Sequence, residues 1–210
     1  MKIIDCEQRS TEWFRARCGV VTASEFDALV TPKWKIKEGQ GPETYLCQKV
    51  AEKLMGWSKD ELQPLSAWVV DQGKIVETIA VPWYEFTYDC KVQRVGFCVS
   101  DDGRLGCSPD GILPNGEGLE IKSPQPDNAI RYLLAGKVPD DYLAQIHFSM
   151  YVTGFKAWNF VSYSRHLPAL VLRVARDEAI QLVIEQALDA FYARFDAALA
   201  KIRGMQEGQP

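Results

Sequence analysis

Short apolar runs separated by glycine-containing turns occupy residues 91–123, and they constrain the fold more than any other part of the sequence. The segments 91–99, 105–113 and 118–123 have the length and composition of β-strands. They are separated by Asp-Asp-Gly at 101–103 and by Asn-Gly at 115–116, which are typical of tight turns. The sequence therefore predicts neighbouring strands in which the residues on either side of each turn lie close together.

Helical patterns flank these strands. Thr22 and Glu25 have the spacing of a capping box, which predicts a short helix that ends near Leu29. At the other end of the chain, Asp177 is expected to cap a long amphipathic helix. The remaining predicted elements are helices over 43–55, over 72–86 with a kink at Pro82 and over 142–152, and strands over 157–163 and 170–175.

This order of elements predicts one α/β domain over residues 1–203, with a central mixed sheet of about five strands flanked by helices. The polar residues 204–210 are expected to form a flexible tail. With 210 residues, the chain is long enough to bury a core without disulfide bonds or structural metals.

Charge and cysteine usage exclude several classes of protein. A net charge of −4 and a pI near 5.3 argue against a protein that coats nucleic acid through bulk attraction. A nuclease remains compatible, because metal ions offset the charge of active-site carboxylates. The six cysteines form no C-x-x-C pair and the two histidines are far apart, so no zinc site is expected, and His147 and His166 are interpreted as structural. No segment resembles a signal peptide or a membrane span, which makes the cytoplasm the expected location.

Two carboxylates and one lysine are expected to meet beside the Asn-Gly turn. Asp110 ends one predicted strand, and Glu120-Ile121-Lys122 lies on the next. Alternate side chains of a strand share a face, so Glu120 and Lys122 point together, and pairing across the turn would bring Asp110 to that face. Carboxylate oxygens hold Mg²⁺, and a nearby lysine can orient or deprotonate the attacking water, which is the combination that phosphodiester hydrolysis requires.

Each of these pieces also has a plain structural interpretation. Pro-Asp-Gly suits an ordinary turn, and Glu-x-Lys suits a solvated strand face. Glu77, a third candidate ligand on the preceding helix, could equally be an exposed charge. The nuclease hypothesis depends on the joint arrangement: Pro-Asp, a ten-residue gap over a turn, and Glu-Ile-Lys inside an apolar strand.

The order of several further segments carries a resemblance to a known family. Those segments are Glu12-Trp13-Phe14, Arg17 to Ser24, Gly73-Lys74 with Glu77, Tyr84 to Thr87, Ser108-Pro109-Asp110-Gly111, Leu119 to Pro124 and Ala144 to Met150. Together they resemble the phage lambda-type recombination exonucleases, also called YqaJ-like viral recombinases, within the PD-(D/E)xK nucleases. The resemblance extends from about Gln8 to the last helix and implies a restriction-endonuclease-like core.

By this resemblance, Asp110, Glu120 and the backbone carbonyl of Ile121 would hold one Mg²⁺ ion. Asp110 would share a second ion with Glu77, and Mn²⁺ is expected to substitute. Lys122 would act on the nucleophilic water.

The resemblance also implies a pocket for a terminal 5′ phosphate, built from Arg17, Ser24, Ser108 and Gln145. Arg17 offers a bidentate fork to a phosphate, and Ser24 lies in the first turn of a predicted helix whose free amides favour anions. The alternative is a plain capping box beside a surface arginine.

Four further positions are candidate DNA contacts. Trp13 could stack on a terminal base or belong to the core. Val70, in the apolar segment 68–70, falls where the family has a wedge between the strands. Lys33 and Lys35 belong to a basic cluster that could contact DNA or be a solvated loop.

The resemblance implies a ring-shaped homotrimer that encloses double-stranded DNA in a bacterial host cell, working for a phage or a prophage. The leading hypothesis is a 5′ to 3′ exonuclease that releases mononucleotides and leaves 3′ single strands for a single-strand annealing protein. Three alternatives remain: an endonuclease of the same superfamily, a non-catalytic protein that binds DNA ends, and an α/β domain with a coincidental motif.

Overall fold

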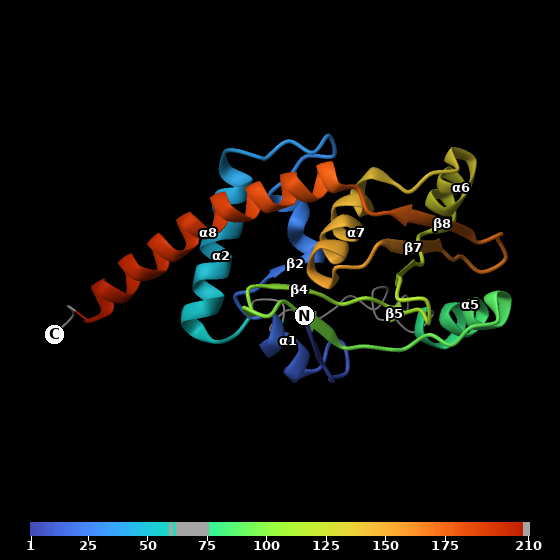
Figure 1. The fold of residues 1–210 in the computed structure, drawn as a ribbon, viewed down its shortest axis with the longest axis horizontal. Coiled ribbons are helices and arrows are strands. Elements are labelled where there is room, and N and C mark those ends of the chain that lie inside the picture. Colours follow the sequence, from blue (N-terminus) through green and yellow to red (C-terminus); the bar gives the residue numbers. More distant parts are fainter. Residues whose placement is uncertain (59–60, 62–75, 208–210) are drawn as a thin grey trace.

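Two four-stranded mixed sheets form the centre of the molecule, with helices packed around them (Figure 1). The computed structural model of the chain describes residues 1–58, 61 and 76–207. The predicted α/β class is confirmed. The single sheet of about five strands is wrong in detail, because the strands divide into the orders β1-β3-β4-β2 and β5-β6-β7-β8.

The first sheet joins the N-terminus of the chain to the predicted hairpin region. It contains β1 (Lys2–Ile4), β2 (Val21–Thr22), β3 (Phe97–Val99) and β4 (Leu105–Cys107). β3 pairs antiparallel with both β1 and β4, whereas β2 runs parallel to β4. This parallel pair brings the start of the chain next to the segment that leads into Asp110.

The second sheet contains β5 (Gly111–Ile112), β6 (Gly118–Lys122), β7 (Ala157–Ser162) and β8 (Leu170–Ala175). β6 pairs antiparallel with β5 and parallel with β7, which pairs antiparallel with β8. Parallel neighbours need a long crossover, and two helices supply it between β6 and β7. Every residue of β7 is buried.

Helices make up most of the remaining described chain. In order they are α1 (Thr11–Arg17), the 3₁₀ helix η1 (Ala23–Ala28), α2 (Gln40–Met55), the π-helix η2 (Val76–Ala80), α5 (Val81–Tyr88), α6 (Pro126–Ala135), α7 (Asp140–Thr153) and α8 (Glu178–Glu207). β1, α1 and α6 were not predicted, and α8 continues to Glu207, into the segment expected to be a tail.

Three predicted elements differ for identifiable physical reasons. The strand predicted over 105–113 is interrupted at 108–110, where Pro109 has no backbone N–H to donate to a ladder. Pro82 lies in the first turn of α5, and η2 leads directly into that helix, so the irregularity predicted at Pro82 takes the form of a change from π-helix to α-helix. Thr22 precedes η1 but makes no side-chain cap, because its hydroxyl donates to the carboxylate of Glu25.

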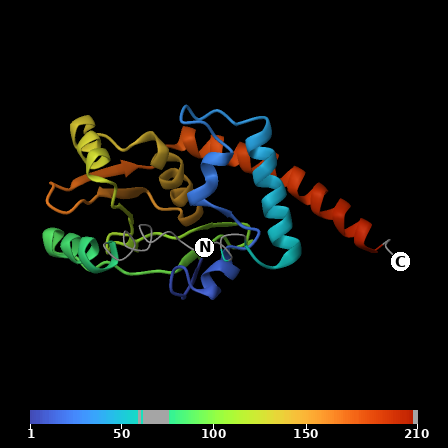
Figure 2. The same ribbon diagram turned by 180° about the vertical axis from the view of Figure 1, so that it is seen from behind.

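Helix α8 closes one side of the molecule. Its cap is confirmed, since the backbone N–H of Ala179 donates to Asp177 Oδ1 at 2.9 Å. Phe191 and Phe195 pack into the largest hydrophobic cluster together with residues of α2 and α7. Beyond these contacts α8 projects past the rest of the chain, as both ribbon views show (Figures 1 and 2). None of the helices in the described residues is long and apolar enough to cross a membrane.

Candidate active site

Strand β6 places Glu120 and Lys122 on one face, as the alternation of its side chains predicts. Lys122 Nζ lies 2.6 Å from Glu120 Oε1. Ile121 points to the opposite face, where it is buried in a cluster with Leu119 and Val161. The strand is therefore anchored by apolar side chains on one face and presents an ion pair on the other.

Asp110 reaches the same point from the segment between the two sheets. Its backbone N–H donates to the carbonyl of Leu119 at 3.0 Å, and its Oδ2 accepts the N–H of Ile121 at 2.6 Å. The β5–β6 register pairs Gly111 with Leu119, so one step further along it sets Asp110 opposite Glu120. The structure thus brings together the two carboxylates and the lysine that the sequence singled out.

The charges at this point are closely coupled. Burial, followed by the nearby charge of Glu120, raises the pKa of Asp110 to about 7. Burial alone would lower the pKa of Lys122, but Glu120, with smaller contributions from Asp110 and Tyr142, raises it. Two carboxylates that repel one another at a partly buried site are an arrangement that a bound cation would stabilise.

Gln145 on α7 connects the two members of the ion pair. Its Oε1 accepts a hydrogen bond from Lys122 Nζ at 3.1 Å, and its Nε2 donates to Glu120 Oε1 at 2.7 Å. The resemblance had placed Gln145 in the phosphate pocket. In the structure its side chain lies with Glu120 and Lys122, a location that no local sequence spacing indicates, because Gln145 follows Lys122 by 23 residues and Glu120 by 25.

The donor set fits a hard divalent cation held by few protein ligands. Asp110 and Glu120 supply carboxylate oxygens, and the carbonyl of Ile121 lies between Glu120 and Lys122 on the same strand. Within the described residues no group of three or more His, Cys, Asp or Glu side chains converges on a metal-sized site. Mg²⁺ usually keeps several waters, so two carboxylates meet its needs. The third candidate, Glu77, lies in η2, and its side chain falls outside the described part of the structure.

A second cluster gathers three of the four residues proposed for the terminal phosphate. Arg17 Nη2 donates to Ser24 Oγ at 3.1 Å. The Arg17 guanidinium stacks 4.1 Å from the ring centre of Trp13, and the indole Nε1 of Trp13 donates to Ser108 Oγ at 2.8 Å. Arg17, Ser24 and Ser108 are thus connected through Trp13. Ser24 lies in the first turn of η1, which is a six-residue 3₁₀ helix.

The other candidate DNA contacts are Lys33, Lys35 and Val70. Lys33 and Lys35 are exposed on the loop between η1 and α2. Between them, the ring of Trp34 meets that of His147 edge-on at 5.3 Å, which fits the structural interpretation of this histidine. Val70, with the rest of 68–70, lies outside the described residues.

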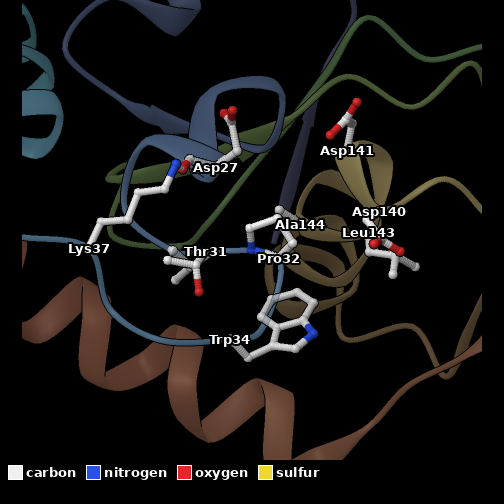
Figure 3. Close-up of a pocket in the computed structure, with 10 residues that line it drawn as sticks. Asp27, Thr31, Pro32, Trp34, Lys37, Asp140, Asp141, Leu143 and Ala144 are labelled. Carbon is white, nitrogen blue, oxygen red and sulfur yellow. Dashed lines mark hydrogen bonds between the residues drawn. The ribbon is translucent and has the colours of Figure 1, made fainter.

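A small cavity of about 130 Å³ opens between that loop and the start of α7. Figure 3 shows Trp34 and Pro32 facing Asp140 and Leu143 across it. None of the predicted site residues lines this cavity. The chemistry described above therefore does not depend on it.

Comparison with known protein families covers the part of the chain that contains both clusters. The model of the YqaJ-like viral recombinase domain matches residues 12–156. The chain belongs to the YqaJ-like viral recombinase family. The matched part of this recombinase domain contains every member of both clusters, namely Trp13, Arg17, Ser24, Ser108, Asp110, Glu120, Lys122 and Gln145.

Solved structures resemble the whole recombinase domain. An alkaline exonuclease from Laribacter hongkongensis, LHK-Exo, has 26% sequence identity to this chain and superposes on it with a TM-score of 0.82. The match covers 94% of this chain and 98% of LHK-Exo. The structure of LHK-Exo in complex with dAMP is 27% identical over the same shares of both chains, also with a TM-score of 0.82. A phage-related exonuclease from Haemophilus somnus 129PT matches 87% of this chain and 96% of its own length, with a TM-score of 0.64. Its sequence identity is 10%, so this match shows only that the fold is shared. Curated protein sequences give no significant match.

Proposed function

We propose that this protein is a Mg²⁺-dependent exonuclease that degrades double-stranded DNA from a 5′ end. It would release 5′-mononucleotides and leave a 3′ single strand for a single-strand annealing protein. The observation that carries the proposal is the position of Asp110 opposite Glu120, with Lys122 Nζ 2.6 Å from Glu120. Family membership and the likeness to an alkaline exonuclease, one form of which was crystallised with dAMP, support the same reaction class.

The roles of the residues follow from their chemistry. Asp110, Glu120 and the Ile121 carbonyl would hold one Mg²⁺, with Glu77 and Asp110 proposed for a second and Mn²⁺ as a substitute. When bound, Mg²⁺ neutralises charge on the transferring phosphate and lowers the pKa of water. Lys122, held by Glu120 and Gln145, would orient the attacking water through its ammonium group.

The proposed polarity depends on the second cluster. Ser108 precedes Asp110 by two residues, so a phosphate held by Ser108 and Arg17 would lie beside the carboxylates. An arginine fork and two hydroxyls suit a phosphate with free terminal oxygens. A 5′-phosphorylated end would therefore be held next to the bond that is cut.

The wider setting is proposed by extension from the family. The protein would work as a homotrimeric ring around DNA in the cytoplasm of a bacterial host. A ring retains DNA by enclosure, which agrees with a chain whose net charge is −4.

The proposal is tested with a linear duplex that carries a 5′ phosphate on one strand only, incubated with Mg²⁺ or with EDTA. Loss of the phosphorylated strand from its 5′ end, only with Mg²⁺, is expected. Digestion in EDTA would contradict the metal site, and no digestion in either condition would favour a non-catalytic end-binding protein. A closed circular duplex serves as the control, since its efficient cleavage would indicate an endonuclease.

A further inference from the structure

Lys49 is a lysine buried between two glutamates, and it is not one of the predicted site residues. On α2, its Nζ lies 2.9 Å from Glu25 Oε2 and 3.0 Å from Glu52 Oε2. Lys49 is 3% exposed and Glu52 is 4% exposed. Lysine and glutamate are almost never this deeply buried unless they are paired, because removing an ion from water is unfavourable. Such a cluster therefore needs a reason beyond filling the core.

The two carboxylates bind the short segment that connects Arg17 to Ser24. Glu52 Oε2 accepts the backbone N–H of Gly19 at 3.0 Å, just after Arg17. Glu25 Oε2 accepts the hydroxyl of Thr22 at 3.0 Å, and Glu25 itself follows Ser24. The ion cluster is thus attached to the proposed phosphate pocket at two points.

Glu25 also interacts electrostatically with Arg17. The Thr22 hydroxyl that donates to Glu25 lies 3.4 Å from Arg17 Nη2. Burial opposes ionisation of Glu25, but Lys49, with smaller contributions from Thr22 and Arg17, lowers its pKa. Glu25 is therefore a carboxylate within reach of two cations, one of which is the proposed phosphate ligand.

We infer that Lys49 is a positioning residue for the terminal phosphate: it compensates the charge of Glu25 and so keeps this carboxylate from competing with DNA for Arg17. The inference rests on the proposed function, because it assumes that Arg17 binds a 5′ phosphate. The sequence alone does not indicate a special role for Lys49. The only signal is a lysine three residues before a glutamate on a helix, which is usually a solvated pair.

Removal of the Lys49 charge has a specific consequence. In Lys49→Met, Glu25 loses its strongest partner, and Arg17 is the other cation that lowers the pKa of Glu25. Arg17 would then turn toward Glu25, and the phosphate would lose a charge-assisted hydrogen bond. Because the lysine touches neither Asp110 nor Glu120, hydrolysis of a bound end should proceed as before.

The test compares kcat and KM with Mg²⁺ on duplexes that carry either a 5′ phosphate or a 5′ hydroxyl. Lys49→Met should raise KM about tenfold for phosphorylated ends, the order expected when one charge-assisted hydrogen bond is weakened. The value of kcat, and both constants for hydroxyl ends, should change less than about twofold. The double variant Lys49→Met/Glu25→Gln should return KM for phosphorylated ends to near the wild-type value. Lys53→Met, which removes the same charge from an exposed position of α2, is the matched control and should leave all constants unchanged.

The outcomes separate the inference from the proposed function. A wild type that does not distinguish the two ends refutes the phosphate pocket and, with it, the inference. A wild type that prefers phosphorylated ends, with Lys49→Met affecting both ends equally or with no rescue by Glu25→Gln, overturns the inference alone.

A thermal melt would reveal whether Lys49→Met fails to fold. In that case a second variant tests the inference. Thr22→Val removes the hydroxyl that lies between Glu25 and Arg17 and leaves Lys49 in place. It should raise KM for phosphorylated ends in the same direction, with rescue by Glu25→Gln. An unchanged KM in Thr22→Val would count against the competition between Glu25 and DNA.

Discussion

The indole Nε1 of Trp13 donates a hydrogen bond of 2.8 Å to the hydroxyl of Ser108. This contact joins α1 to the segment that carries Asp110, across 95 positions of sequence. The same ring supports the guanidinium of Arg17 from a distance of 4.1 Å. Trp13 therefore fixes two of the proposed phosphate ligands at once, a role different from stacking on a terminal base.

Replacement of Trp13 separates these two roles. Trp13→Phe keeps an aromatic face for Arg17 but removes the donor to Ser108. It should lower kcat/KM for 5′-phosphorylated ends about two- to tenfold, the value of one net hydrogen bond, and leave hydroxyl ends unchanged. Steady-state kinetics on both substrates measures this, with Trp57→Phe at an exposed position as the control. An equal loss on both ends would indicate base stacking instead.

Lys122 is expected to be needed for cleavage and not for binding. In Lys122→Met the amine next to Glu120 is lost while the carboxylates remain, so the rate of hydrolysis should fall roughly 10²- to 10⁴-fold. Affinity for duplex ends in Mg²⁺, measured by fluorescence anisotropy, should stay close to that of the wild type. Lys137→Met, at an exposed lysine paired with Asp140, is the matched control. Undiminished cleavage by Lys122→Met would refute the role assigned to this lysine.

Gln145 should act at the carboxylates and not at the terminal phosphate. Its amide holds both Glu120 and Lys122, so Gln145→Leu should reduce kcat on phosphorylated and hydroxyl ends by the same factor, about tenfold for the loss of two hydrogen bonds. The ratio of kcat/KM between the two ends is the deciding measurement. A lower ratio of kcat/KM for phosphorylated over hydroxyl ends would indicate that Gln145 contacts the terminal phosphate.

The pKa of Asp110 predicts how stability depends on pH in the absence of metal. This pKa is raised from 3.8 to about 7, which means that the folded chain binds the proton more tightly than the unfolded chain. The resulting stabilisation is complete below about pH 4 and is lost as the pH rises through about 7.

Urea unfolding in EDTA measures this loss. Between about pH 5 and about pH 8, the wild type should lose on the order of 2–3 kcal/mol more free energy of unfolding than Asp110→Asn, which cannot titrate. Mg²⁺ should restore stability at the higher pH by binding the ionised carboxylate. Parallel pH dependences of the two proteins would mean that Asp110 ionises freely.

Local rules predicted those parts of the molecule in which neighbours in sequence are neighbours in space. The Asn-Gly turn sets the β5–β6 register, and strand alternation then places Glu120 with Lys122 and brings Asp110 opposite. The cap of α8 by Asp177 is equally local. These features depend on a few consecutive residues, so the sequence contains all the information they need.

Long-range packing decided the rest. Of the strand predicted over 91–99, β3 contains Phe97–Val99. These are the residues that pair with β1 and β4, so the extent of β3 is set by its partner strands and not by its apolar pattern. The partition into two sheets, the position of Gln145 and the burial of Lys49 all depend on contacts between distant elements. Nothing in the local sequence distinguishes Lys49 from an exposed lysine on a helix.

The change of sheet at residues 108–110 has a consequence for the size of the product. Ser108 follows the last strand of the first sheet and Asp110 precedes the first strand of the second. Under the proposed function, the group that locates the DNA end and the group that acts on the scissile bond are thus separated by a single residue, Pro109, whose ring restricts the backbone. The length of the released fragment would then be set by covalent geometry, and an insertion at Pro109 would be expected to change it.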